Sequence, residues 1–96
     1  MSLEEIVARL RAHRDELQAL GVKDLFLFGS FVRKEAGPGS DLDVAVELIE
    51  PVSFDRLMAL KLYLEDLLGV PVDVVRLRAL KPSLRRIVER EGLRVA

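Results

Sequence analysis

The sequence contains no cysteine and a single histidine, His13. Without cysteine there is no disulfide framework and no thiolate ligand, and one histidine cannot build a histidine metal centre. Any metal ion in this protein must therefore be held by oxygen ligands. His13 itself lies among Arg11, Arg14 and Asp15, off the apolar stripe of the helix predicted there, so we interpret it as a solvated side chain.

An excess of charge of one sign is also missing. The 15 lysine and arginine residues oppose 16 aspartate and glutamate residues, which gives a formal net charge of -1 at pH 7. A nucleic-acid backbone is usually held by a strong positive field. We therefore expect no direct nucleic-acid partner.

Long hydrophobic runs are absent as well. None approaches the roughly 18 residues of a membrane-spanning helix, and the acidic start Met1–Glu5 lacks the basic and apolar regions of a secretion signal. We expect a cytoplasmic protein with no membrane segment. Its 96 residues suffice for a single domain, 1–96, with one core, so a bulky acceptor would bind in a shallow cleft or be presented by a partner.

Apolar residues spaced three and four apart predict three long helices. The first follows a capping box formed by Ser2 and Glu5 and continues to Gly21. The second covers Phe54–Leu68, and the third covers Leu84–Glu91. The apolar residues of the second helix occupy more than one face, so they could pack a second layer of the core or contact a partner.

Apolar runs between these helices predict the strands of one sheet. The strands Val22–Phe28 and Val70–Leu77 do not alternate and are expected to be buried on both faces, whereas alternate residues of Asp41–Leu48 face the core. The other predicted elements are a short helix at Ser30–Glu35, a turn at Gly37-Pro38-Gly39-Ser40 and a short edge strand at Leu93–Ala96. This order, αβαβαβα(β), predicts an α+β domain with an α/β-like succession of elements, in which helices pack on a small mixed sheet.

Three aspartates lie in or beside the predicted strands. Asp41 and Asp43 are two residues apart, so their side chains leave the same face, with Cα atoms roughly 6.5 Å apart, and can converge on the same ion. Two divalent ions held by carboxylates and phosphates are the usual machinery of phosphoryl displacement. Asp73 interrupts an apolar strand, where an unpaired charge is costly, and could supply a third carboxylate.

Two of these acids could instead have a structural role. Asp41 could end the turn that follows Ser40, and Asp73 could be a strand-end residue paired with an arginine. Asp43 lies inside its strand, so the turn interpretation does not apply to it. Asp43 is therefore the central residue of the predicted site.

Gly29 and Ser30 directly follow the first strand. Glycine lets the backbone approach a phosphate closely, and Ser30 with the following amides would form a helix N-terminus that binds phosphate oxygens. Arg33 could neutralise the leaving pyrophosphate, with solvated surface charge as the alternative, and we interpret Lys34 as surface charge. Gly-Ser followed by Asp-x-Asp, between two apolar strands, indicates nucleotide transfer.

The segment from Phe28 to Ala36, FGSFVRKEA, with Asp41-Leu42-Asp43 ten residues after Ser30, resembles the signature of minimal nucleotidyltransferases of the DNA polymerase β-like superfamily. The resemblance extends over nearly the whole chain. One departure is Lys34, because the family usually has glycine after the arginine.

The resemblance implies a role for each of these residues. Gly29 and Ser30 would bind the triphosphate of ATP or another NTP, while Asp41 and Asp43 would hold Mg²⁺ with Asp73 as the third acid. Many similar domains are antitoxins encoded with a helical HEPN toxin, which some inactivate by transferring AMP to a tyrosine.

The leading hypothesis is therefore a Mg²⁺-dependent nucleotidyltransferase that moves NMP, as AMP from ATP, to a hydroxyl of a HEPN-type toxin with which it forms a hetero-oligomer. The alternative is a non-catalytic, nucleotide-binding antitoxin that neutralises its toxin by contact. Transfer to a small molecule is a third possibility, which we disfavour because no acceptor-binding domain is expected after Ala96. In the leading hypothesis the helix Phe54–Leu68 supplies part of the docking face, since the chain itself offers no evident wall to orient an acceptor.

Overall fold

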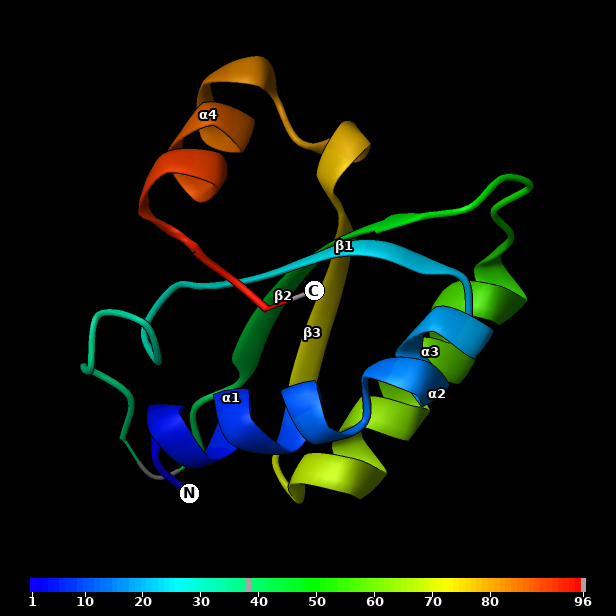
Figure 1. The fold of residues 1–96 in the computed structure, drawn as a ribbon. Coiled ribbons are helices and arrows are strands. Elements are labelled where there is room, and N and C mark those ends of the chain that lie inside the picture. Colours follow the sequence, from blue (N-terminus) through cyan, green and yellow to red (C-terminus); the bar gives the residue numbers. More distant parts are fainter. Residues whose placement is uncertain (38, 96) are drawn as a thin grey trace.

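A four-stranded sheet with the order β3-β2-β1-β4 forms the centre of the computed structural model, which describes residues 1–37 and 39–95 (Figure 1). The strands are β1 (Val22–Phe28), β2 (Leu42–Leu48), β3 (Val72–Arg76) and β4 (Leu93–Arg94). β1 runs antiparallel to β2 and β4, while β2 and β3 are parallel. This mixed sheet confirms the predicted α+β class. The edge strand predicted at Leu93–Ala96 is confirmed at Leu93–Arg94, and Ala96 lies outside the described residues.

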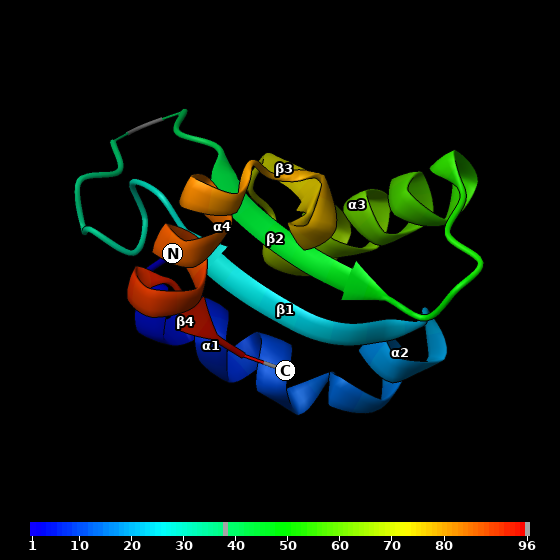
Figure 2. The same ribbon diagram turned by 90° about the horizontal axis from the view of Figure 1, so that it is seen from above.

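Helices pack on both faces of the sheet (Figures 1 and 2). One face carries α1 (Leu3–Ala12), α2 (Arg14–Ala19) and α3 (Phe54–Leu68), and the other carries the 3₁₀ helix η1 (Leu77–Ala79) and α4 (Pro82–Glu91). The predicted bounds of α3 are confirmed, with Ser53 as N-cap and a left-handed Gly69 as C-cap. α4 begins two residues before the predicted start because proline is well suited to the first helical position.

The prediction of one continuous helix from Leu3 to Leu20 is wrong. The helix is interrupted at His13, which separates α1 from α2. The His13 ring donates from Nδ1 to the carbonyl oxygen of Arg9 at 2.9 Å. That carbonyl is the one that a continuous helix would pair with the His13 amide, which instead donates to Leu10 at 3.1 Å. His13 is therefore a helix-breaking residue and not merely a solvated one.

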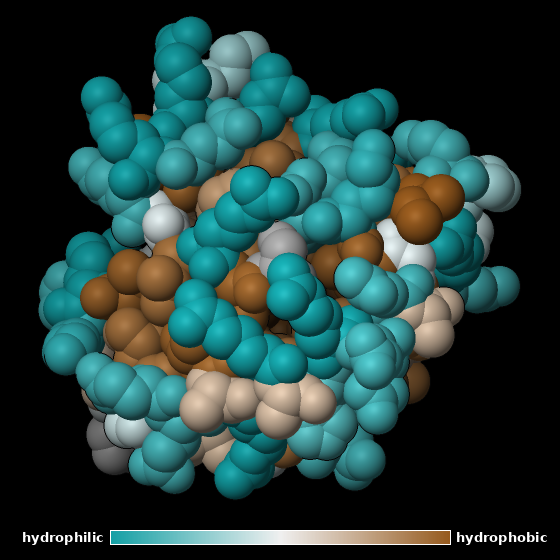
Figure 3. Space-filling model, viewed as in Figure 1, coloured by the Kyte–Doolittle hydropathy of each residue, from teal (hydrophilic) through white to brown (hydrophobic). Residues whose placement is uncertain are grey.

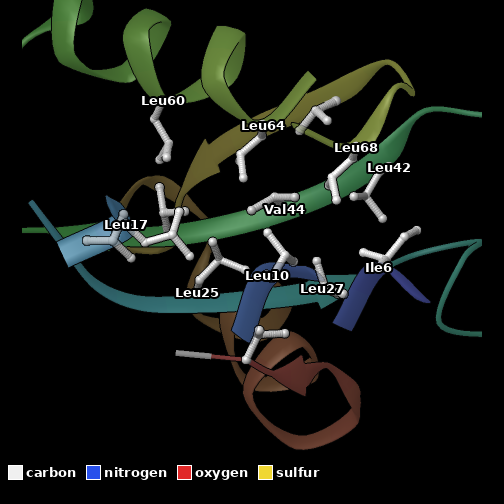
Figure 4. Close-up of a cluster of buried hydrophobic side chains, with 14 of the residues drawn as sticks. Ile6, Leu10, Leu17, Leu25, Leu27, Leu42, Val44, Leu60, Leu64 and Leu68 are labelled. Atoms are coloured by element: carbon white, nitrogen blue, oxygen red, sulfur yellow. The ribbon is translucent and has the colours of Figure 1, made fainter. Parts of the chain in front are cut away.

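The larger core lies between the sheet and α1, α2 and α3. Figure 4 shows Leu60, Leu64 and Leu68 of α3 directed toward β2 and β1. Residues of β2 alternate as predicted. Its core-facing side chains are Leu42, Val44, Val46 and Leu48, while Ala45 belongs to the smaller cluster under η1 and α4. β1 is buried on both faces, also as predicted, since Leu27 enters the larger cluster and Phe26 the smaller one.

β3 differs from its prediction as a strand buried on both faces. It is an edge strand of five residues in which only Val72 is fully buried, and Leu77, predicted as its end, begins η1. Because β3 pairs with β2 on one side only, its side chains reach solvent. Asp73 is exposed, so solvent can stabilise its charge without a metal ion or a partner side chain.

The apolar surface of α3 serves mainly the core. Leu60, Leu64 and Leu68 are buried, whereas Phe54 and Leu62 are the large apolar residues of this helix that remain exposed, at 74% and 59%. Apolar side chains also line a groove of about 410 Å³ between α1 and β4, where Figure 3 shows a hydrophobic patch. None of the helices in the described ranges is long and apolar enough to cross a membrane.

The short helix predicted at Ser30–Glu35 does not form. The amides of Arg33, Lys34 and Glu35 donate to carbonyl groups four, three and five residues back, so the segment is an irregular turn. Lys34 has a φ of 59°, a left-handed conformation that a helix cannot continue through. The following turn closes between Gly37 and Ser40, as predicted, although Pro38 itself lies outside the described residues.

Lys34 adopts a backbone conformation that glycine reaches more easily than lysine. We expect Lys34→Gly to raise the free energy of unfolding by up to about 1 kcal/mol, because it removes the steric cost of a left-handed side chain. The exposed ion pair between Lys34 and Glu4 would be lost, but a solvated pair contributes little. Thermal melting should show an increase of a few degrees.

Lys34→Ala is the matched control, since it breaks the same ion pair and keeps a Cβ at a positive φ. It should melt at or below the temperature of the unaltered chain. Equal melting temperatures for the glycine and alanine variants would show that the left-handed backbone costs nothing here.

Candidate active site

The predicted site residues lie together at one end of the sheet, where β1 ends and where β2 and β3 begin. Phe28, at the end of β1, lies opposite Asp43 of β2 in the antiparallel register. Asp43 also lies beside Asp73 of β3 in the parallel register. The side chain of Asp43 thus stands between the turn that begins at Gly29 and the exposed carboxylate of Asp73, while Asp41 precedes β2 by one residue.

Gly29 and Asp43 are in very close contact. A Cβ added at Gly29 would overlap with Oδ2 of Asp43 and lie 3.0 Å from its Cγ. The φ of Gly29 is +77°, which also disfavours any residue with a side chain. The Gly-Ser pair and the Asp-x-Asp pair are therefore one structural unit, because the carboxylate occupies the space that a side chain at position 29 would need.

The electrostatics of the site centre on Asp43. Partial burial, and then the neighbouring carboxylates of Asp73 and Asp41, raise the pKa of Asp43 above its ordinary value, while Arg33 opposes them. The site is therefore an unbalanced cluster of negative charge, which a cation would stabilise.

The three carboxylates provide only hard oxygen donors, the ligand type that Mg²⁺ prefers. Their donor chemistry therefore fits a divalent cation. Within residues 1–37 and 39–95, however, no three acidic or histidine side chains are arranged as a ready metal-binding set.

Ser30 and Arg33 lie in the turn after β1. Without the predicted helix, Ser30 is not an N-cap, and the amides of an irregular turn take the place of a helix N-terminus. Arg33 lines the same cleft as Gly29 and Asp43, although its Nε donates to Glu35 at 2.9 Å. The structure thus brings Arg33 to the site while also giving it the surface ion pair that the alternative interpretation expects.

An open cleft of about 340 Å³ adjoins Asp43. One side of the cleft is lined by residues of β1, of the turn after β1 and of β2. The other side is lined by α4 and Gly92. The lining residues are Phe28, Gly29, Val32, Arg33, Asp43, Leu84, Ile87, Val88, Glu91 and Gly92. Figure 2 shows α4 across the end of β1 and the start of β2. This wall formed by α4 was not predicted from the sequence.

The wall formed by α4 is held firmly against the sheet. Val88, 1% exposed, packs with Phe26, Ala45 and Leu77 in the smaller core cluster. η1, which leads into α4, is fixed by an ion pair of 3.1 Å between Arg78 and the buried carboxylate of Glu47 on β2. Sequence periodicity locates the apolar face of α4, but the pairing of β4 with β1 decides that this face meets the cleft.

A mixed sheet with acidic residues on two parallel strands, beside a glycine turn and an open cleft, defines a nucleotidyltransferase-type domain. The chain belongs to the nucleotidyltransferase domain family, whose model matches residues 10–95.

Within this family the chain is similar to protein adenylyltransferases. It is 42% identical to protein adenylyltransferase MntA of Thermococcus cleftensis over 92 residues, which cover 95% of this chain and 93% of the relative. A solved structure assigned as a minimal nucleotidyltransferase is 42% identical and superposes with a TM-score of 0.85, over 97% of this chain and 95% of that one. A structure of the toxin–antitoxin MntA–HepT is 25% identical, with a TM-score of 0.61 and coverage of 97% and 68%.

We expect Gly29→Ala to destabilise the protein by more than the roughly 1 kcal/mol that a positive φ costs an alanine, because the added Cβ must also displace the Asp43 carboxylate. Gly39→Ala is the control, since Gly39 has a φ of +81° and open space around it. Denaturant unfolding of both variants measures the difference. If they lose equal stability, the contact with Asp43 imposes no constraint.

We also expect Asp43→Asn to raise the melting temperature at pH 7 in metal-free buffer. Because the folded-state pKa of Asp43 is raised, its charge destabilises the fold above that pKa, and this cost disappears below the unfolded-state value. The variant and the unaltered chain should therefore converge at about pH 3. A variant that melts lower at pH 7 would show that the Asp43 carboxylate stabilises the empty site.

Proposed function

We propose that this chain transfers AMP from ATP to a tyrosine hydroxyl of a HEPN-type toxin and thereby acts as an antitoxin. The observation that carries the proposal is the Asp43 carboxylate held against Gly29, in register with Asp73, at the floor of an open cleft. The similarity to protein adenylyltransferase MntA supports the same reaction. ATP is abundant in the cytoplasm, where we place the reaction.

The turn after β1 is the proposed triphosphate site. Gly29 has no side chain, so phosphate oxygens can approach the backbone amides that follow it, and Ser30 adds a hydroxyl donor. Arg33 lines the same cleft and can turn from Glu35, on the surface, toward the β- and γ-phosphates.

The carboxylates of Asp41, Asp43 and Asp73 are the proposed ligands of Mg²⁺, with two ions as the expected number. When bound, Mg²⁺ offsets the negative charge that develops on the phosphoryl oxygens. The raised pKa of Asp43 fits this assignment, since a carboxylate repelled by its neighbours gains most from a cation.

In the proposed step the acceptor hydroxyl oxygen bonds to the α-phosphorus of ATP. The bond from this phosphorus to the bridging oxygen of the β-phosphate breaks, pyrophosphate leaves, and a carboxylate of the cluster takes the hydroxyl proton. Because the cleft is open, the partner reaches the phosphorus along the wall formed by α4. The residues of this chain thus position ATP, and the partner presents the acceptor.

Incubation with labelled ATP, Mg²⁺ and the product of the neighbouring gene tests the proposal, with mass spectrometry to detect added AMP. Asp43→Asn should lower the rate of transfer at least about a hundredfold, because it removes a proposed metal ligand while preserving side-chain volume. Asp66→Asn, an exposed acid on α3, is the control and should transfer at the unaltered rate. Calorimetry should show weaker ATP binding after chelation of Mg²⁺.

Asp73→Asn tests the third acid in the same assay. A retained rate would remove Asp73 from the site. Formation of a complex without AMP transfer would favour the alternative of an antitoxin that acts by contact alone. Efficient transfer to a free small molecule, with no complex, would contradict a protein acceptor.

A further inference from the structure

Charge is unevenly distributed along a chain whose net charge is nearly zero. The segment from Arg76 to Arg94 holds seven of the 15 basic residues and two of the 16 acidic ones. Its formal net charge is therefore +5, and that of the remainder of the chain is -6. Within this segment, residues 77–91, which form η1, the N-cap of α4 and α4, hold five basic and two acidic residues, a net charge of +3. α4 lines the proposed nucleotide cleft, so the net basic charge lies on and next to the element that bounds this cleft.

Part of this basic charge is already paired within the chain. Arg76 and Arg78 form ion pairs with acidic residues of β2 and the loop that follows it, and Arg94 contacts Asp24. In the part of the chain that the structure describes, four basic side chains of this segment form no ion pair or hydrogen bond, namely Lys81, Arg85, Arg86 and Arg90 of α4 and its N-cap.

The charge of Lys81 also opposes the dipole of α4. Lys81 occupies the N-cap without capping the helix through its side chain, and the first turn contains no acidic residue. The N-terminus of a helix carries partial positive charge, so basic side chains there raise the energy of the free protein. An external acidic group would relieve this repulsion.

The outer face of α4 changes from apolar to basic with distance from the cleft. Leu84 and Ile87 line the cleft and remain 42% and 44% exposed. Arg90 follows Ile87 by one helical turn, and Arg86 lies one turn before Arg90. Arg86 and Arg90 line a separate shallow groove with Glu89, so they are outside the nucleotide cleft. Figure 3 shows hydrophilic side chains projecting in the region of α4.

We infer that the outer face of α4, formed by Leu84, Ile87, Arg86 and Arg90, docks an acidic surface of the protein that receives AMP. This inference rests on the proposed function and locates the acceptor on α4 instead of α3. Exposed aliphatic residues beside a cationic rim are typical of protein interfaces. α4 has no aromatic residue on which a base could stack, so a nucleic acid is disfavoured as the occupant of this face.

The double variant Arg86→Glu/Arg90→Glu tests this surface. Binding to the product of the neighbouring gene should weaken at least about tenfold, because both charges would then repel an acidic partner. Transfer of AMP to that protein should fall in parallel, while calorimetric affinity for ATP with Mg²⁺ stays unchanged. The unaltered chain should bind the partner less tightly as salt increases.

Arg14→Glu/Lys23→Glu is the matched control. It makes the same change in net charge on exposed residues of α2 and β1, at the end of the sheet away from Gly29, and should bind within about twofold of the unaltered chain. Ile87→Ser should weaken partner binding without any change in net charge.

Several outcomes would overturn the assignment of this surface. Unchanged binding and transfer by Arg86→Glu/Arg90→Glu would do so, as would an equal loss of binding in the control variant. Loss of affinity for a single-stranded RNA oligonucleotide with partner binding intact would identify a nucleic-acid surface instead. If the unaltered chain neither binds nor modifies the partner while ATP still binds, the proposed function itself is wrong and this inference fails with it.

Discussion

The contact between the backbone of Gly29 and the carboxylate of Asp43 is the constraint on which the site depends. It joins the end of β1 to the start of β2 at a point where no side chain at position 29 would fit. It also holds a partly buried charge near two other carboxylates, which is unfavourable in the free protein. Two features therefore favour glycine at position 29. They are its positive φ and the Asp43 carboxylate, which fills the space that a side chain would need.

The fold tolerates this unfavourable cluster because its two faces are organised differently. One face of the sheet buries a continuous apolar layer against α1, α2 and α3, which supplies the main hydrophobic stabilisation. The other face has a smaller apolar cluster and leaves the cleft between β1, β2 and α4 open. β2 contributes to both faces of the sheet, since Val44 packs in the larger core while Asp43 lines the cleft.

The position of α4 links the second face to the proposed reaction. The packing of Val88 and an ion pair between the buried Glu47 carboxylate and the exposed Arg78 hold η1 and α4 against the sheet, while β4 returns the chain to pair with β1. Transfer to a protein needs two surfaces at a fixed distance, one for the nucleotide and one for the acceptor. In the proposed reaction α4 would contribute to both surfaces, since its apolar residues line the cleft and its arginines line a separate groove on the outer side.

The sequence by itself determined the fold class, the bounds of β1 and α3 and the alternation of β2, because these depend on local hydrophobic periodicity and capping residues. It also brought Gly29, Asp41 and Asp43 into one hypothesis through their spacing. Only the tertiary structure decided that Asp73 is exposed on an edge strand, that His13 breaks the first helix, and that the segment after Ser30 is a turn ending at a left-handed Lys34. The arginines on the outer side of α4, next to but outside the cleft, were likewise not evident from a balanced net charge. These features depend on which strands become neighbours and which side-chain groups compete for a backbone carbonyl, and neither is encoded in a periodic pattern.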